Sequence, residues 1–252
     1  SAASDVYKRQ LFPLVMPQVR DLWSYGETGY HSLSAAVVQE RYSREAMVSA
    51  FRILGEGQLS LTKFLLLTDH PQDLKDFKAV LTHILERADF RTDLFVFANL
   101  SMDTLDYTGP AVNKGSKGVL LGCGDAVRTL PREFSGALPR GASAAEVFSP
   151  GCIVVQGPSY EEDTNWASVV ASCDTLRDWP LVILADNAQR CAKSSINFLW
   201  TVFTRFEPAA DIHSRAIEIV RNHLAYRAPI VIDARMKPWY PEELFCDAGT
   251  EK

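Results

Sequence analysis

Apolar residues follow two alternating patterns along the chain, short continuous runs and helical spacing. The runs at 63–68 (KFLLLT) and 180–185 (PLVILA) each precede an aspartate, Asp69 or Asp186, and suit buried strands. Each run is followed by apolar residues on one helical face, namely Leu74, Phe77, Val80, Leu81, Ile84 and Leu85, and later Ile196, Leu199, Val202, Phe203 and Phe206. Strands that alternate with helices predict the α/β class, with a largely parallel or mixed sheet.

The same patterns predict elements on either side of these segments. A helix is expected over 43–54, with Ser43 as its N-cap and Gly55 as its stop. A helix is also expected in the stretch that holds His213 and His223. The remaining strands are predicted at 34–42, 93–98 and 229–234.

The two strand and helix segments predict an internal repeat over about 60–100 and 178–215. The first helical segment closes with RADFRTD and the second with RFEPAAD, so an Arg and an Asp recur together. These pairs, Arg87 with Asp93 and Arg205 with Asp211, suggest a helix-terminal cap or salt bridge. The alternative is that any two strand and helix units share such a hydrophobic rhythm.

Composition narrows the function classes. The 252 residues are 47% hydrophobic and 23% charged, with a formal net charge of -5, which is typical of a globular protein and disfavours nucleic-acid binding. The five cysteines form no CxxC pair, so neither a disulfide framework nor a thiolate zinc site is expected. Cysteines without a disulfide or a metal are typical of proteins in the reducing cytoplasm, so we expect a cytoplasmic location. A peripheral position at the membrane is the alternative. No apolar stretch approaches the length of a membrane helix.

The first ten residues, SAASDVYKRQ, have neither the apolar centre of a signal peptide nor a capped helix start. We expect residues 1–10 to be a non-native or disordered leader. The rest of the chain, 11–252, is then one structural region, which would be part of a longer protein.

A glycine-rich loop is predicted at 106–124 (DYTGPAVNKGSKGVLLGCG). Glycines allow a close backbone approach to a ligand, and lysine supplies a positive charge for phosphate. Neither the Walker A pattern nor GxGxxG is present. The residues alone therefore favour an anion-binding loop and a solvated, turn-rich loop about equally.

Several segments in order resemble the C-terminal part of the UbiD family of decarboxylases, which depend on prenylated FMN. They are YHSLSAAVVQ, LDYTGP followed by GSKG, the two strand and helix segments, and PIVIDARMKPWYP. The resemblance implies a UbiD C-terminal-type layered sheet with helices over 11–252, containing a duplicated strand-helix unit. It implies that the flavin phosphate contacts Lys117, that the flavin site includes Thr108, Gly109, Gly115 and Ser116, and that His31 is a weaker candidate for substrate contact.

The implied activity is non-oxidative decarboxylation of an aromatic acid, a carboxy-lyase reaction in quinone biosynthesis. In the family a Glu–Arg–Glu network supplies the acid, while Asn, His and Glu hold a divalent metal, Mn or Mg, with K also considered at the flavin phosphate. These residues lie upstream of the matching segment, so no catalytic residue and no metal ligand is assigned in this chain. Adjacent Glu161 and Glu162 suit a solvated loop better than catalysis.

The resemblance leaves the substrate and the role of the chain open. The second repeat and PIVIDARMKPWYP favour the menaquinone-type subgroup, which acts on dihydroxynaphthoate, over polyprenyl-hydroxybenzoate decarboxylases of ubiquinone synthesis. Expected partners are a small aromatic acid, further copies of the chain and a flavin prenyltransferase as cofactor supplier. The alternatives are an assembly module that is inactive alone and an unrelated α/β nucleotide-binding protein.

The C-terminal segment offers a further candidate site. Arg235 and Lys237 could bind an anion or steer the tail. Trp239 and Tyr240 are better explained as a hydrophobic clasp. The five histidines show no metal-binding spacing, so structural roles are favoured for them.

Overall fold

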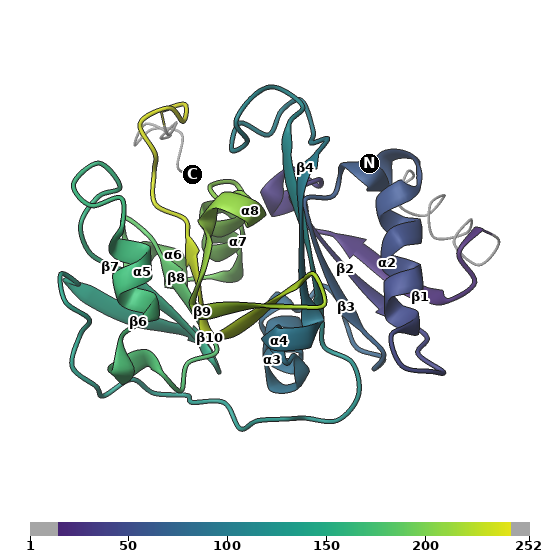
Figure 1. The fold of residues 1–252 in the computed structure, drawn as a ribbon, viewed down its shortest axis with the longest axis horizontal. Helices are drawn as coiled ribbons and strands as arrows, with labels where there is room; N and C mark the ends of the chain where they lie inside the picture. Colours follow the sequence, from purple (N-terminus) through teal and green to yellow (C-terminus); the bar gives the residue numbers. More distant parts are fainter. Residues whose placement is uncertain (1–14, 243–252) are drawn as a thin grey trace, which may run out of the picture.

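The computed structural model describes residues 15–242, which form two units with one five-stranded sheet each (Figure 1). The leader predicted at 1–10 lies outside the described residues. The first unit, residues 19–121, contains β1 (Val19–Ser24), β2 (Leu33–Val38), β3 (Phe64–Thr68), β4 (Leu94–Leu100) and β5 (Gly115–Leu121). The second unit, residues 144–233, contains β6 (Ala144–Ser149), β7 (Cys152–Gln156), β8 (Leu181–Leu184), β9 (Ile212–Val220) and β10 (His223–Asp233).

The two sheets have the same topology. Their strand orders are β1-β2-β3-β5-β4 and β6-β7-β8-β10-β9. In each sheet the three central strands are parallel, and both edge strands are antiparallel to their neighbours. The α/β class expected from alternating strands and helices is confirmed. The shared strand order agrees with the internal repeat predicted from the sequence, which stays a prediction.

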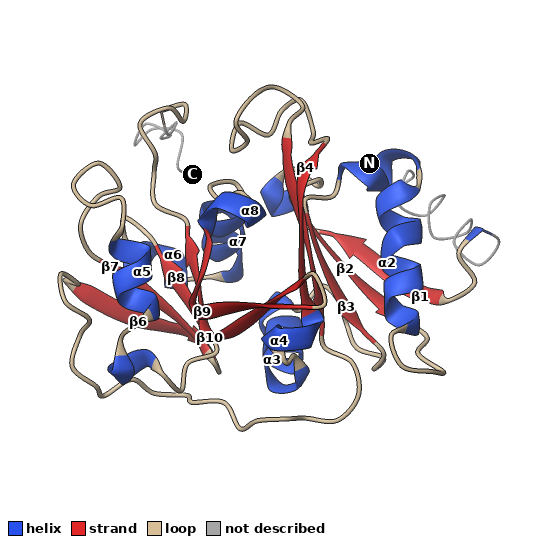
Figure 2. Cartoon of the chain, in the orientation of Figure 1, coloured by secondary structure: helices blue, strands red, loops and turns tan. Residues whose placement is uncertain are grey.

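Several helices hold equivalent places in the two units, namely α2 and α5, α3 and α7, and α4 and α8, whereas η1 and α6 have no counterpart (Figure 2). Asp76 caps α3 by accepting the N–H of Ala79, and Ser194 caps α7 by accepting the N–H of Asn197. The first unit has η1 (Gly26–Thr28), α2 (Glu45–Gly55), η2 (Gly57–Leu61), α3 (Phe77–Arg87) and α4 (Phe90–Asp93). The second has α5 (Trp166–Ala171), η3 (Asp174–Leu176), α6 (Ala188–Ala192), α7 (Ser195–Phe203) and α8 (Pro208–Asp211).

Two aspartates make the same contact in both units. The carboxylate of Asp93 accepts the backbone N–H of Asp89, and that of Asp211 accepts the N–H of Glu207, both at 2.7 Å. The recurring aspartate therefore caps the short helix that leads into β4 or β9, which was one of the two roles predicted for it.

The main core lies between the sheets and belongs to both units (Figure 1). Phe77 of α3 packs against Phe198 and Phe203 of α7, with ring centroids 5.8 and 6.2 Å apart. Two smaller cores lie on the outer sheet faces, one under α2 and one under α5. Alternate residues of β3 point to opposite faces, because Phe64 and Leu66 join the shared core whereas Leu65 and Leu67 contact the α2 side.

Several boundaries differ from the predictions. The strand predicted over 34–42 is β2, which ends at Val38. Ser43 is not the N-cap of α2, because the helix begins at Glu45 after Arg44, whose φ is 70°. His213 and His223 lie on β9 and β10, not on a helix, since these residues pair as an antiparallel hairpin.

The loop predicted at 106–124 contains a strand. Residues 115–121 form β5, which is buried throughout and pairs with β3 on one side and β4 on the other. Its glycines are required by close packing, because a Cβ on Gly118 would lie 2.3 Å from the ring of Phe64. The glycine content therefore reflects close neighbours of the strand, and within the predicted range only residues 106–114 and 122–124 lie outside it.

Candidate functional site

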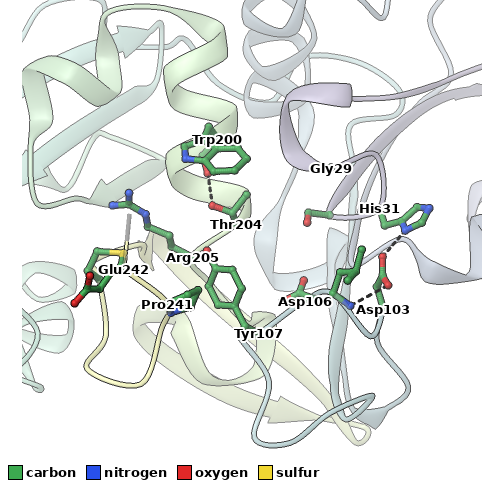
Figure 3. Close-up of a pocket in the computed structure, with 13 residues that line it drawn as sticks. Gly29, His31, Asp103, Asp106, Tyr107, Trp200, Thr204, Arg205, Pro241 and Glu242 are labelled. Atoms are coloured by element: carbon green, nitrogen blue, oxygen red, sulfur yellow. Dashed lines mark hydrogen bonds and ion pairs between the residues drawn. The ribbon is translucent and has the colours of Figure 1, made fainter. Parts of the chain in front are cut away.

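A cavity of about 520 Å³ lies between the two units (Figure 3). We call it the inter-unit crevice. The first unit supplies its walls from the segment before β2 and from the loop after β4. The second unit supplies the last turn of α7 and the segment after β10. The lining residues are Gly29, His31, Ser32, Asp103, Leu105, Asp106, Tyr107, Trp200, Thr204, Arg205, Met236, Pro241 and Glu242.

On the first-unit side, His31 and Asp103 form an ion pair, provided that the imidazole is protonated. Asp103 also accepts the backbone N–H of Leu105 at 3.1 Å. Burial raises the pKa of Asp103, but the hydrogen bonds from His31 and the backbone outweigh this, so its pKa lies below the usual value. His31, the predicted substrate contact, therefore lines a cavity with one ring nitrogen engaged by a carboxylate.

On the second-unit side, Arg205 contributes a cation from the residues after α7. Its guanidinium lies 3.3 Å from the carboxylate of Asp186, which also accepts the N–H of Met236. The carbonyl of Arg205 accepts hydrogen bonds from the ammonium of Lys237 and from the hydroxyl of Tyr240, each at 3.2 Å. These bonds fix the backbone on this side of the crevice.

The crevice also has apolar walls. Leu105 is 85% exposed and Trp200 is 49% exposed, and both line it together with Tyr107. A concave site with mostly apolar walls and a few polar groups is typical of a small-molecule site. The aromatic faces suit a planar ligand. Asp103, Asp106 and Glu242 also line the crevice. His31 and Arg205 are each paired with a carboxylate, so the lining alone does not set the charge of that ligand.

A buried ion pair lies beneath the crevice. Lys63 and Asp106 are 2.8 Å apart, and both side chains are almost fully buried. Asp106 also accepts the hydroxyl of Thr108 at 2.6 Å. Burial lowers the pKa of Lys63, although Asp106 opposes this effect. The pair holds the loop after β4 against β3, and the sequence reasoning missed it, although a lysine before an apolar strand was a visible signal.

The predicted flavin residues Lys117 and Ser116 lie on β5, behind the crevice. The ammonium of Lys117 donates to the carbonyls of Ser60 and Thr62, at 2.7 and 2.8 Å. Burial lowers its pKa to about 8. The hydroxyl of Ser116 accepts the N–H of Ala209 at 2.8 Å, so it joins β5 to the second unit.

The other three predicted residues, Thr108, Gly109 and Gly115, lie at the base of the loop. Thr108 is buried against Asp106. A Cβ on Gly109 would lie 2.0 Å from the carbonyl oxygen of Lys114, and one on Gly115 would lie 1.6 Å from the sulfur of Met102. These glycines allow the loop to fold back closely on itself.

The residues present do not form a phosphate cradle. A cradle needs several donors directed at one point. Here the Ser116 hydroxyl is engaged with the second unit, and the N–H of Lys114 donates to Ala111 within the loop. Lys117 keeps one ammonium proton beyond its two carbonyl partners, because an ammonium has three. Among the five predicted residues, only Lys117 offers the phosphate of a flavin a cationic contact.

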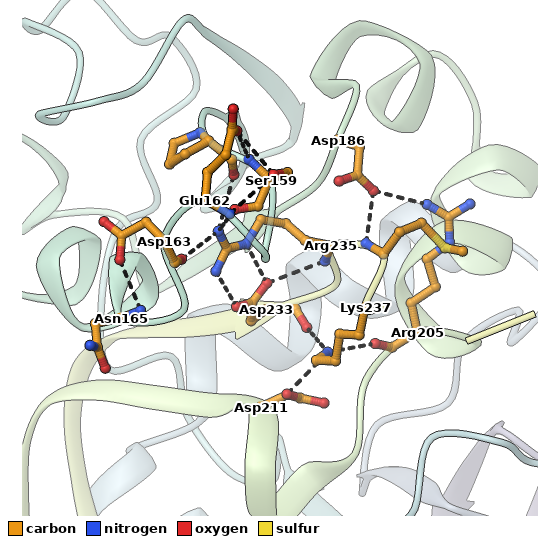
Figure 4. Close-up of polar contacts among 12 residues, drawn as sticks. Ser159, Glu162, Asp163, Asn165, Asp186, Arg205, Asp211, Asp233, Arg235 and Lys237 are labelled. Carbon is orange, nitrogen blue, oxygen red and sulfur yellow. Dashed lines mark hydrogen bonds and ion pairs between the residues drawn. The ribbon is translucent and has the colours of Figure 1, made fainter. Parts of the chain in front are cut away.

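Arg235 and Lys237, the C-terminal candidates for anion binding, form hydrogen bonds and ion pairs within the chain instead (Figure 4). Arg235 forms two hydrogen bonds to Asp233, at 2.9 and 2.7 Å, and donates to the carbonyls of Pro158, Ser159 and Asp163. The anion-binding hypothesis for Arg235 is therefore wrong.

Lys237 is engaged in the same way as Arg235. Its ammonium lies 3.1 Å from Asp211 and donates to the carbonyls of Arg205 and Asp233. These three contacts use all its N–H groups, so the anion-binding hypothesis for Lys237 is also wrong. In the predicted clasp, Tyr240 is buried whereas Trp239 is largely exposed.

Within residues 15–242 no group of three His, Cys, Asp or Glu side chains is arranged to hold a metal ion. Glu162 lies in an exposed loop, where it accepts the N–H and hydroxyl of Ser159. In the same described range, no helix is both long and apolar enough to cross a membrane. Trp200 and Thr204 were not predicted as site residues, because the crevice joins segments that are far apart in sequence.

Comparisons with known proteins identify relatives of both units. Residues 2–122 match the family model described as the 3-octaprenyl-4-hydroxybenzoate carboxy-lyase C-terminal domain, UbiD_C. A protein of Chlamydia pneumoniae that is named as a 4-hydroxybenzoate decarboxylase subunit is 48% identical over 98% of this chain, which covers 42% of that relative. An uncharacterized protein of Chlamydia trachomatis is 46% identical over 96% of the chain and 41% of its own length. The chain thus spans less than half the length of these relatives.

Among solved structures, the vanillic acid decarboxylase of Sedimentibacter hydroxybenzoicus in open form aligns with a TM-score of 0.43 and 17% identity, over 47% of this chain and 25% of that one. A UbiD-class enzyme of Pelotomaculum thermopropionicum, in complex with FMN, aligns with a TM-score of 0.41 and 16% identity. That alignment covers 45% of this chain and 25% of the enzyme.

Proposed function

Since the chain carries a UbiD C-terminal domain in residues 2–122, we propose that it is the C-terminal part of a UbiD-type decarboxylase. The reaction is the non-oxidative loss of CO2 from an aromatic acid, either a hydroxyarene or a dihydroxynaphthoate carboxylic acid, in quinone biosynthesis. The observation that supports this most strongly is the 48% identity, across both units, to a protein named as part of a 4-hydroxybenzoate decarboxylase.

The inter-unit crevice is the substrate-facing surface in this proposal. Its aromatic faces, Trp200 and Tyr107, suit a planar ring. A substrate carboxylate would have to compete with Asp103 for His31 and with Asp186 for Arg205. The loop that covers the crevice is tied down by the buried pair of Lys63 and Asp106. A preorganised wall of this kind loses little conformational entropy when a ligand binds.

The proposal assigns binding and positioning, not proton transfer, to this chain. The catalytic acid and the metal ligands belong to other parts of the longer protein. Prenylated FMN is the proposed cofactor, and Lys117 is the residue of this chain proposed to contact it. That contact would use the ammonium proton that the carbonyls of Ser60 and Thr62 leave available.

An assembly role is the second candidate, and the β9–β10 hairpin favours it. Ile219, Ile217 and Val220 are exposed on β9, an edge strand of the second sheet. Exposed apolar side chains on a free strand edge are typical of surfaces that pair with another chain or domain. This role is compatible with a homo-oligomeric decarboxylase.

The test is an activity assay of the longest open reading frame that contains this chain. The protein would be co-expressed with a flavin prenyltransferase and assayed for CO2 release from 4-hydroxybenzoate and from a dihydroxynaphthoate acid. Release from either acid supports the proposed function, and release from the naphthoate alone supports the menaquinone-type assignment. If protein that is shown to contain the flavin releases CO2 from neither acid, the assembly role is the better explanation.

A further inference from the structure

A hollow lies beside each helix that packs across the two units, because α7 packs against η1 of the first unit and α3 packs against β6 of the second. The inter-unit crevice lies between the start of β2 and the last turn of α7, with His31 facing Trp200 and Thr204. The second crevice lies between α3 and the end of β6 with the turn that follows it, and its lining includes Thr82, Glu86 and Pro150.

The two helices can be compared position by position. Each is capped at the preceding residue, Asp76 or Ser194, and each leads to the recurring arginine, Arg87 or Arg205. Counted from these arginines, Trp200 corresponds to Thr82 and Thr204 corresponds to Glu86. The second unit therefore presents an indole to the inter-unit crevice, where the first unit presents a small hydroxyl to the second crevice.

Only the inter-unit crevice has a covering loop. In the first unit, residues 101–114 join β4 to β5 and bring Leu105, Asp106 and Tyr107 to the cavity. In the second unit, β9 and β10 are joined by a tight turn at Arg221 and Asn222, whose φ values are 53° and 65°. The two units thus differ in that a loop covers part of the inter-unit crevice, whereas the second unit has a tight turn at the equivalent place.

Trp200 faces the inter-unit crevice as a large, half-exposed side chain on a regular helix (Figure 3). The hydroxyl of Thr204 donates to the backbone carbonyl of Trp200 at 2.6 Å, at the end of the helix. An indole with an accessible face is suited to stacking on a planar ring.

We propose that Trp200 is a specificity-determining residue of the inter-unit crevice and that it selects aromatic acids by ring size. The indole stacks on the ring of the acid, so a two-ring acid gains more contact than a one-ring acid. The residue comes from the second unit, outside the residues matched by the family model. This inference rests on the proposed function, because it takes the ligand to be an aromatic acid.

The test measures binding to the 252-residue chain, with no turnover needed. Isothermal titration would use 6-hydroxy-2-naphthoate as the two-ring probe and 4-hydroxybenzoate as the one-ring probe. Stacking contributes about 0.5 to 1.5 kcal/mol, or about 2- to 10-fold in affinity. We expect Trp200→Ala to weaken naphthoate binding by about that factor and benzoate binding by less. Trp200→Phe should retain part of the preference.

The control is Ile196→Ala, which removes an apolar side chain that is 63% exposed on the same helix but does not line the crevice. It should leave both affinities unchanged. An unchanged ratio of the two affinities in Trp200→Ala, in a chain that keeps its circular dichroism spectrum, would overturn the inference, as would the absence of binding of either acid to the wild type. Neither result depends on the decarboxylation assay, so the two proposals can fail separately.

Discussion

Tyr107 and Tyr240 meet edge to face, with ring centroids 5.1 Å apart, and this contact joins the loop after β4 to the segment after β10. The two residues belong to different units and are distant in sequence. Tyr240 is buried and its hydroxyl donates to the carbonyl of Arg205. The contact therefore joins the two sides of the inter-unit crevice near its mouth, and its loss should be measurable in stability.

Replacing Tyr240 by Phe removes the hydrogen bond to Arg205 and keeps the ring contact. We expect the free energy of unfolding to fall by about 1 kcal/mol, because the buried carbonyl of Arg205 loses the Tyr240 hydroxyl as a donor and keeps Lys237. Urea denaturation followed by fluorescence measures this. Tyr42→Phe, at an exposed tyrosine, is the control and should change stability by less than about 0.5 kcal/mol. Equal effects in the two variants would show that the hydrogen bond contributes little.

The Lys63 and Asp106 pair predicts a larger effect. Asp106→Asn removes the charge that compensates a buried ammonium, and we expect a loss of about 3 to 5 kcal/mol in the free energy of unfolding. The matched surface pair is Arg52 with Glu56, 3.3 Å apart and largely exposed. Glu56→Gln should cost less than about 1 kcal/mol. A small effect of Asp106→Asn would indicate that water reaches the pair.

Lys117 predicts a pH dependence of stability. Burial lowers its pKa to about 8 in the folded chain, below the value of about 10.4 for an unfolded lysine. Between these values the unfolded chain binds more protons than the folded chain, so this residue's contribution to stability rises with pH. The rise should be about 1 to 2 kcal/mol, since solvent screens part of the interaction.

The measurement for Lys117 compares the wild type with Lys117→Met, because buried tyrosines and cysteines also titrate at high pH. Stability would be determined in denaturant from pH 7.5 to 10.5. The difference between the two proteins should grow in favour of the wild type as pH rises. In the longer protein, flavin retention by Lys117→Met can be compared at equal stability. Unchanged retention would assign Lys117 a structural role only.

Gly118 predicts a packing defect. A Cβ at this position of β5 would lie 2.3 Å from the Phe64 ring, inside the shared core. We expect Gly118→Ala to lower the free energy of unfolding by about 1 to 3 kcal/mol, as overpacking does. Gly55→Ala is the control, since no atom lies within 4 Å of its added Cβ. Thermal melts of the two variants would show whether the glycine is needed for packing rather than for ligand approach.

The sequence predicted the fold class well but misread residues 115–121. The runs that end at Asp69 and Asp186 had the apolar continuity of buried strands, and both are central strands. β5 is equally buried but contains two glycines, a serine and a lysine. Glycines and polar residues are typical of loops, so this strand resembled one. The groups that pack on its glycines, Met102 and Phe64, and the carbonyls that accept from its lysine come from elsewhere in the chain.

The candidate site could be predicted only in part for a related reason. His31 was identified and does line the crevice. Trp200 was not predicted as a site residue, because helical periodicity indicates which residues are buried together but not which crevice an exposed one faces. The juxtaposition of α7 with β2 depends on how two units pack, and a single sequence does not encode that in local patterns.

The shared core has a consequence for synthesis on the ribosome. The first unit has all five strands once residue 121 has emerged, but the apolar face of α3 packs on α7, which is made much later. Until residues 195–203 appear, Phe77 and its neighbours have no partner from the second unit. A nascent or trimmed chain that stops near residue 122 would therefore expose an apolar surface that is prone to aggregation. It would need a chaperone, or the second unit supplied in trans, to remain in solution.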